Sequence, residues 1–217
     1  MSEDRSTRRI RLGMVGGGEG SFIGAAHRAA ARLDDQFELV AGALSSTPGR
    51  AHASAAGLHI AHDRSYADYA EMARAEARRS DGIDAVAIVT PNHLHVPVAL
   101  AFVEQGLHVI CDKPLATSLA EAQTLARAVR EKNVLFLLTH TYAGYPMVRE
   151  AREMVAAGEL GELRIVQVEY AQDWLGQPVE RMGNKQAEWR ADPQRAGPAG
   201  ALGDIGTHAH HLAEFVT

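Results

Sequence analysis

Residues 11–28 read RLGMVGGGEGSFIGAAHR, and the expected fold follows from this stretch. An apolar run ending at Val15 meets glycines at positions 16, 17, 18 and 20, and apolar residues then resume. A strand, a glycine-rich turn and a helix in this order open doubly wound α/β folds on a dinucleotide phosphate. The glycines let the backbone approach the ligand, and the helix N-terminus offers free N–H groups. The cofactor-binding residues predicted here are Gly16, Gly18, Ser21, Phe22 and Ile23.

The glycine turn is longer than the usual pattern. Counted from Gly16 it reads G-x-G-x-x-S and ends at Ser21. We interpret it as a lengthened loop in which Gly24 provides the close helix–strand contact. A glycine-rich turn also closes ordinary βα units, so the turn alone leaves both interpretations open. The helical residues predicted to form a buried stripe are Phe22, Ile23, Ala25, Ala26, Ala29 and Ala30.

Composition excludes some functions. The 217 residues carry a net charge of −5 with interspersed charges, which argues against a nucleic-acid partner. The basic residues at positions 5, 8, 9 and 11 are explained by a solvated tail. No apolar run approaches the ~20 residues needed to cross a bilayer, and no secretory signal follows the arginines. With Cys111 as the single cysteine, we expect a cytoplasmic protein without a membrane partner.

Strand and helix patterns alternate through the first 140 residues. Continuous apolar runs at residues 37–44, 84–90, 107–111 and 134–139 predict buried parallel strands. Helical patterns separate them, one opening at Ser65, one covering residues 96–105 and one opening at Ser118 with a capping box. The sequence therefore predicts an α/β fold, with a doubly wound parallel sheet of Rossmann type in residues 1–141.

The pattern changes from Tyr142 onward. A helix is predicted over residues 145–157, an alternating half-exposed strand over 165–170, a long polar connection over 172–203 and a helix from Asp204. One strand and two helices are too few to make a second layer, so we interpret residues 142–217 as the incomplete start of a second domain.

The residues after the second strand bear on cofactor choice. A carboxylate there would hold the ribose hydroxyls of NAD, whereas a basic residue accommodates the extra phosphate of NADP. The chain has Ser45, Ser46 and Arg50 and no carboxylate, which favours NADP slightly over NAD. An equally good interpretation is that these residues cap the next helix. Thr90, Pro91, Asn92 and His95 follow the third strand and could line the ligand crevice or cap the next helix.

Three residues could carry proton chemistry. Lys113 follows a strand and precedes a proline, so it is either a desolvated lysine at the ligand edge of the sheet or a solvated loop lysine. Asp204 and His208 are four apart on a predicted helix, where a carboxylate can orient an imidazole for proton transfer. Such pairs are also common on helix surfaces. His208, His210 and His211 lack the partners of a known zinc spacing, so no metal site is expected.

Four motifs together resemble the Gfo/Idh/MocA oxidoreductases, the family of glucose–fructose oxidoreductase and inositol dehydrogenase. They are Ile23-Gly24-x-x-His27, Thr90-Pro91-Asn92-x-x-His95, Asp112-Lys113-Pro114 and Gly200-x-x-Gly203-Asp204-x-Gly206-x-His208. Asp112 replaces the family's usual glutamate, the glycine turn is longer, and members continue for well over a hundred residues past the last motif.

The resemblance implies NAD(P)-dependent oxidation of a secondary hydroxyl on a sugar or cyclitol, in a homo-oligomer when full-length. It also implies that residues 142–217 are the start of an open-sheet α/β domain. Lys113, Asp204 and His208 would be the catalytic group, and Asp112 and Lys113 would also contact the cofactor. Two alternatives stay open. One is an NAD(P)-sensing regulatory protein without chemistry, and the other is a lyase or glycosidase that oxidises its substrate transiently with tightly held NAD.

Overall fold

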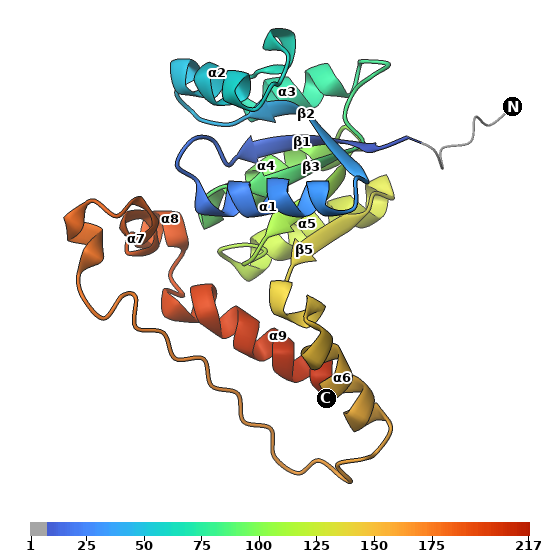
Figure 1. The fold of residues 1–217 in the computed structure, drawn as a ribbon, viewed down its shortest axis with the longest axis vertical. Helices are drawn as coiled ribbons and strands as arrows, with labels where there is room; N and C mark the ends of the chain where they lie inside the picture. Colours follow the sequence, from blue (N-terminus) through green and yellow to red (C-terminus); the bar gives the residue numbers. More distant parts are fainter. Residues whose placement is uncertain (1–7) are drawn as a thin grey trace, which may run out of the picture. The chain divides into compact units, whose positions relative to one another are not determined.

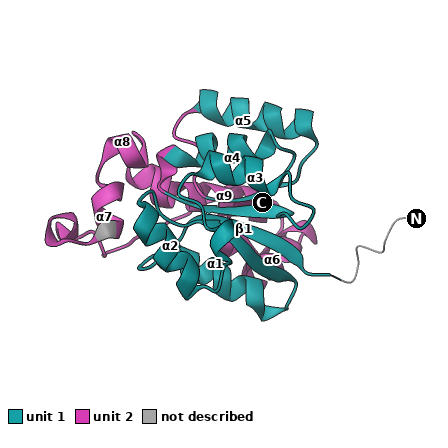
Figure 2. Cartoon of the chain, turned by 90° about the horizontal axis from the view of Figure 1, so that it is seen from above, with its two compact units in different colours: residues 1–90, 94–112, 119–137 teal, residues 91–93, 113–118, 138–217 magenta. Residues whose placement is uncertain are grey.

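The chain divides into two compact units (Figure 2). The structure, a computed structural model, describes residues 8–217 apart from the side chain of Lys185. Unit 1 takes in the chain up to Thr90 together with residues 94–112 and 119–137, and unit 2 takes in residues 91–93, 113–118 and 138–217. Each unit is described below by itself.

Unit 1 is built on a five-stranded sheet (Figure 1). Its strands are β1 (Ile10–Gly16), β2 (Phe37–Ala43), β3 (Ala85–Val89), β4 (His108–Asp112) and β5 (Phe136–Thr139). Their spatial order is β2-β1-β3-β4-β5, and β1 pairs in parallel with both β2 and β3. The chain therefore changes direction across the sheet at β1, which is where open α/β sheets bind ligands. The predicted doubly wound α/β fold is confirmed.

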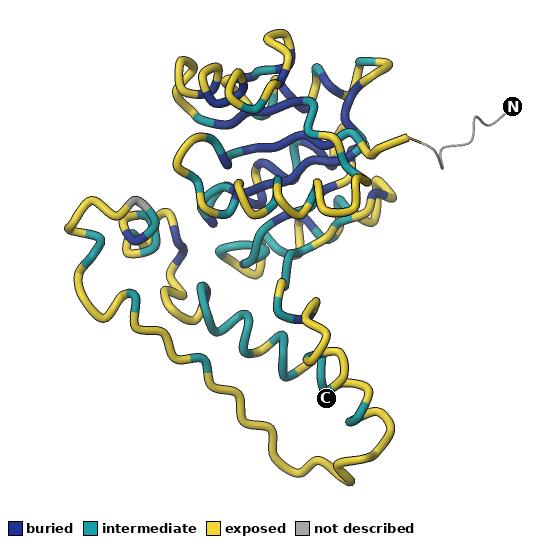
Figure 3. The backbone as a smooth tube through the Cα atoms, in the orientation of Figure 1, coloured by how far each residue is buried: buried dark blue, intermediate teal, exposed yellow. Residues whose placement is uncertain are grey.

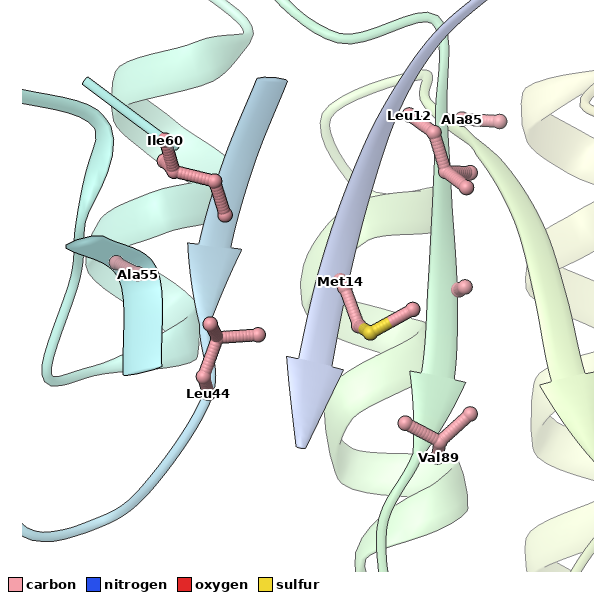
Figure 4. Packing of buried hydrophobic residues seen from close by; sticks show 8 residues of the cluster. Leu12, Met14, Leu44, Ala55, Ile60, Ala85 and Val89 are labelled. Carbon is pink, nitrogen blue, oxygen red and sulfur yellow. The ribbon is translucent and has the colours of Figure 1, made fainter. Parts of the chain in front are cut away.

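Helices α1 (Phe22–Leu33), α2 (Pro48–Gly57), α3 (Tyr69–Glu76), α4 (His95–Val103) and α5 (Leu119–Lys132) connect the strands. Every residue of β3 is buried, as its unbroken apolar sequence predicts for a central parallel strand (Figure 3). The core beside it is aliphatic, and Figure 4 shows its members Leu12, Met14, Leu44, Ala55, Ile60, Ala85 and Val89. No helix in the described part of the chain is long and apolar enough to cross a membrane.

Two predictions about the helices of unit 1 are wrong. The helix expected to open at Ser65 begins at Tyr69, because the N–H of Tyr66 is bonded to the carbonyl of Gly42 and Asp68 caps the helix instead. The alanine stripe of α1 is exposed, and so is Phe22, with 77% of its surface accessible. The inward face of α1 carries Gly24, since this residue packs against the glycine turn.

Unit 2 is mainly helical. It contains α6 (Pro146–Ala156), α7 (Lys185–Arg190), α8 (Pro193–Ala196), a π-helical turn η6 (Leu202–Gly206) and α9 (Thr207–Val216). Helices α6 and α9 pack together, and the guanidinium of Arg152 lies 4.7 Å from the ring centroid of Phe215. The turn η6 leads directly into α9, so the chain places Asp204 and His208 on consecutive turns.

The strand predicted over residues 165–170 is wrong. These residues are extended without strand pairing, and most of this segment is exposed (Figure 3). The exposed fraction of Ile165 is 86%. A strand needs a neighbour to accept and donate its backbone hydrogen bonds. Within the described residues no strand lies beside this segment, so its alternating pattern has nothing to pair with.

Candidate active site

The glycine turn after β1 presses against the ends of the neighbouring strands. Gly16 and Gly17 have φ angles of +77° and +74°, a region that favours glycine. A Cβ atom on Gly16 would lie 2.7 Å from the carbonyl oxygen of Val89, and one on Gly18 would lie 2.6 Å from that of Leu44. Gly16 and Gly18 therefore leave no room for a side chain, and the turn stays close to the carboxyl ends of the neighbouring strands.

The N-terminus of α1 completes this cradle. Ser21 caps the helix by accepting a hydrogen bond from the N–H of Gly24 at 3.3 Å. A Cβ on Gly24 would lie 2.5 Å from Cα of Gly17, so the predicted close helix contact at Gly24 is confirmed. Bare turn backbone next to a helix N-terminus is the arrangement that holds a dinucleotide pyrophosphate, so these residues fit that group.

The remaining predicted cofactor residues of unit 1 lie at the ends of its parallel strands. Ser45 follows β2 and its Oγ accepts the N–H of Thr47 at 3.2 Å, while Ser46 and Arg50 are exposed. Thr90 follows β3, and its carbonyl lies 3.0 Å from Nε2 of His95. His95 is buried, so its side chain braces the loop after β3 from inside.

A polar side-chain contact that the sequence analysis missed ties α1 to the end of β4. Nε2 of His27 lies 2.9 Å from Oδ1 of Asp112, and both side chains are largely buried. The next residue along the chain, Arg28, donates from Nη1 to the carbonyl of Gly17 at 2.6 Å. His27 belongs to the first sequence motif, which was the available signal, but its partner could only come from the fold.

Within unit 2, Lys113 and Asp204 form a direct ion pair. Nζ of Lys113 lies 2.7 Å from Oδ1 of Asp204 and also donates to the backbone carbonyl of Asp204. Nε of Arg190 lies 3.2 Å from the second carboxylate oxygen, Oδ2. Burial alone would raise the pKa of Asp204, but the hydrogen bond and charge of Lys113, with those of Arg190, outweigh it and lower the pKa. The carboxylate is therefore ionised and shared by two cations.

The charges of Lys113 and Asp204 affect the pKa of His208. Burial and the positive charge of Lys113 lower the pKa of His208 to about 4, against a smaller opposite effect of Asp204. The ring of His208 lies 4.6 Å from that of Tyr142, measured between centroids. At neutral pH the imidazole is thus neutral and able to accept a proton.

Another imidazole adjoins His208. The ring of His140 lies 6.1 Å from that of His208 and stacks on His211 at 3.8 Å. Burial lowers the pKa of His140, with help from His211 and Lys113. Its Nδ1 is buried without a hydrogen-bond partner among the described residues. His140 directly follows β5, so its position after a strand was the signal that could have revealed it.

Two tyrosine rings, those of Tyr142 and Tyr170, lie beside the imidazole of His208. The hydroxyls of Tyr142 and Tyr170 lie 2.6 Å apart, and Gln172 donates to the hydroxyl of Tyr170 at 2.8 Å. The hydrogen bond to Tyr170, together with burial, raises the pKa of Tyr142 to about 12. The hydroxyl of Tyr142 is therefore neutral at neutral pH. No sequence motif indicated that Tyr142 and Tyr170 would be in contact.

Asn92 and His93 also belong to unit 2. The side-chain amide of Asn92 is buried and donates to the carbonyl of Ala196 at 2.8 Å. Nδ1 of His93 lies 3.1 Å from the carbonyl of Arg195. These contacts hold the end of α8.

The catalytic candidates Lys113, Asp204 and His208 bring together a cation, a carboxylate and a neutral base. That set can remove a proton from a hydroxyl and stabilise the oxygen that remains.

The chain matches two family descriptions. Residues 10–140 match the oxidoreductase family with an NAD-binding Rossmann fold, and residues 148–217 match the GFO/IDH/MocA C-terminal domain. The fold and these matches define the class as a family of oxidoreductases with an NAD-binding Rossmann fold. The chain belongs to the Gfo/Idh/MocA family.

Similar proteins include enzymes that act on cyclic polyols and sugars. An inositol dehydrogenase homologue from Azotobacter vinelandii, solved with NAD+, is 44% identical with a TM-score of 0.94, over 98% of this chain and 54% of that one. A second structure of an A. vinelandii homologue holds NADH and myo-inositol, with 42% identity and a TM-score of 0.89 over 97% and 53% of the two chains.

The curated relatives are also named as oxidoreductases or dehydrogenases. Levoglucosan dehydrogenase of Pseudarthrobacter phenanthrenivorans is 32% identical over 96% of this chain and 51% of its own length. The uncharacterized oxidoreductase YfiI of Bacillus subtilis is 34% identical over 97% of this chain and 54% of its own. The chain thus spans about half the length of the relatives it matches.

Proposed function

We propose that the protein is an NAD(P)-dependent dehydrogenase that oxidises a secondary hydroxyl of a sugar or cyclitol. The observation that carries the proposal is the contact of Lys113 with Asp204 beside a neutral, partly buried His208. The glycine cradle of unit 1 supplies the binding surface for a dinucleotide. The names of the A. vinelandii and P. phenanthrenivorans relatives favour a ring-shaped polyol or anhydrosugar as the substrate.

Each residue of the catalytic group has a distinct role in the proposed reaction. His208 accepts the proton of the substrate hydroxyl, for which its imidazole has to be neutral. Lys113 donates a hydrogen bond to the same oxygen and stabilises the negative charge that develops as the proton leaves. Asp204 orients Lys113 and balances its charge. A bound nicotinamide cofactor would supply the acceptor for the hydride of the carbinol carbon.

The proposal is tested by following NADH or NADPH absorbance at 340 nm with a panel of substrates. The panel contains myo-inositol, levoglucosan, an aldose and a linear polyol, and the protein carrying Lys113→Met is the matched control. We expect reduction with a cyclic substrate and its loss in the control. Cofactor binding without oxidation of any substrate would overturn the dehydrogenase in favour of a sensor. Substrate turnover without net absorbance change would favour the lyase or glycosidase alternative.

Cofactor preference forms a separate part of the proposal. We propose that NADP binds at least as tightly as NAD, on the basis of Ser45, Ser46 and Arg50 and the missing carboxylate. The bound cofactor of the A. vinelandii homologue is NAD+ or NADH, which favours the opposite preference. Titration of both reduced cofactors by fluorescence, with the protein and with Arg50→Gln, decides the matter. A strong preference for NAD that Arg50→Gln leaves unchanged would contradict a role for Arg50.

A further inference from the structure

Arg190 reaches the proposed catalytic group from a separate helix. It is the last residue of α7, and its Nε lies 3.2 Å from Oδ2 of Asp204. Lys113 occupies the other oxygen of the same carboxylate at 2.7 Å. Each oxygen of Asp204 thus has its own cation, and the three side chains together carry one net positive charge.

The guanidinium of Arg190 is held in a fixed direction. Its Nη1 donates to the backbone carbonyl of Gln186 at 3.0 Å and to Oε1 of the same residue at 2.9 Å. Its central carbon lies 4.2 Å from the ring centroid of Trp189 and 5.6 Å from that of Trp174. A planar guanidinium can stack on indole rings and donate from a rigid fork at the same time, whereas a lysine ammonium cannot.

This arrangement has a consequence for Lys113. A carboxylate paired with one lysine alone can rotate to give both oxygens to the ammonium. With the bond that Lys113 already makes to the backbone carbonyl of Asp204, this would use all three of its N–H donors. Because Arg190 holds Oδ2, only Oδ1 faces Lys113, and the lysine keeps donor capacity for another oxygen. Arg190 also keeps Asp204 ionised, since its charge and hydrogen bond oppose the effect of burial.

We propose that Arg190 is a positioning residue that acts through Asp204, fixing this carboxylate so that Lys113 stays free to donate to the substrate oxygen. The proposal rests on the function proposed above. It assigns the tryptophans to the support of Arg190, with Trp189 as the closer ring.

The kinetic test compares the purified wild-type protein with Arg190→Gln and Arg190→Lys. Arg181→Gln is the matched control, because Arg181 lies in the preceding turn with its side chain 83% exposed. We expect Arg190→Gln to lower kcat about 100-fold, the scale for misplaced catalytic groups, with little change in KM for the cofactor. Arg190→Lys should recover only a small part, since it restores the charge without the stacking. The acid limb of kcat/KM for Arg190→Gln should also lie at higher pH than that of the wild type.

Three kinetic results would overturn the proposal. They are a wild-type kcat in Arg190→Gln, full rescue by lysine, and an increase of the polyol KM alone, which would make Arg190 a substrate ligand. Circular dichroism and thermal melting of each variant separate a folding defect from a positioning defect, and Arg190→Lys remains informative if the glutamine variant does not fold.

A second readout does not depend on activity. Carbon-13 NMR titration of Asp204 in the 217-residue chain should show a higher pKa in Arg190→Gln than in the wild type, with no change in Arg181→Gln. An unchanged pKa would overturn the link between Arg190 and Asp204 even if the enzyme is active. If the wild type oxidises no polyol, the proposed function fails while this titration still tests the ion pair.

Discussion

Nζ of Lys113 lies 2.7 Å from Oδ1 of Asp204, although 91 residues separate them in the chain. Lys113 immediately follows the last residue of β4, and Asp204 sits in the π-helical turn before α9. The pair is neither fully buried nor freely exposed, so it is accessible to a substrate while its charges are only partly screened by water. Proton transfer in the proposed reaction depends on this contact.

Replacement of His208 by alanine should remove the proposed general base. A positioned base contributes typically 10²–10⁴-fold, so kcat should fall on about that scale. The matched control is His210→Ala on the same helix, because the side chain of His210 is 82% exposed. Initial rates with saturating cofactor and substrate provide the measurement. Equal rates for the two variants would refute the role of His208.

The pH dependence of kcat/KM should extend unusually far toward acid. The pKa of His208 is lowered to about 4, so the imidazole stays neutral and competent as pH falls past 6. An imidazole with the ordinary value of 6.5 would lose activity there. Rates measured from pH 4.5 to 8 in a constant-ionic-strength buffer check this. An acid limb near pH 6.5 would mean that burial does not act on His208 in solution.

The free energy of unfolding should fall as the pH is lowered below about 6.5. The pKa values of His140 and His208 are both lowered in the folded protein, so the unfolded chain binds more protons in this window. Stability is therefore retained above the unfolded pKa and lost as pH falls through the folded pKa. Urea midpoints at pH 7.5 and pH 5 measure the loss. The double variant His140→Gln, His208→Gln should show a smaller difference, and an equal difference would contradict the assignment.

Substitution of Gly24 by alanine should weaken dinucleotide binding and destabilise unit 1. The new Cβ would lie 2.5 Å from Cα of Gly17, and relief of such overpacking costs about 1–3 kcal/mol. Gly57→Ala is the matched control, since no atom lies within 4 Å of its added Cβ. NADH fluorescence titration and urea denaturation of both variants provide the test. Unchanged binding in Gly24→Ala would show that the cradle does not hold the cofactor.

Loss of the Glu76 charge should destabilise the core side of α3. Glu76 is 1% exposed and accepts from Arg64 and from the hydroxyl of Tyr66. Removing one partner of a buried ion pair costs about 3–5 kcal/mol, because the other charge is left uncompensated. Urea denaturation of Glu76→Gln measures this. Glu162→Gln breaks a largely exposed pair with Arg164 and should leave the midpoint unchanged. Similar midpoints for both variants would contradict the prediction.

The sheet and its glycine turn could be predicted because local signals agree with the fold. The fully buried strand β3 has an unbroken apolar sequence, and the contact of Gly24 with Gly17 needs only a strand, a turn and a helix in succession. The burial of α1 could not be predicted, because its alanines suit either face of a helix. The domain boundary at residue 141 stays a prediction.

The candidate site was less predictable because its contacts join distant residues. Lys113, Asp204 and His208 could be named from motifs, but their partners Arg190 and Tyr142 carry no local signal. The pairing of Tyr142 with Tyr170 depends on where an extended segment lies. That segment was predicted to be a strand from its alternation, and alternation alone does not provide a partner.

The π-helical turn Leu202–Gly206 makes the length of this segment as important as its composition. The N–H of Thr207 is bonded to the carbonyl of Leu202, five residues back, so the turn holds one residue more than an α-helix would. Because the wider turn takes up the extra residue locally, its removal would leave the direction of α9 nearly unchanged. Asp204 lies inside the turn and His208 lies beyond it, four positions later. Deleting Ile205 would leave them three positions apart and shift the carboxylate along the turn relative to His208. This short stretch should therefore accept conservative substitutions more readily than the loss of one residue.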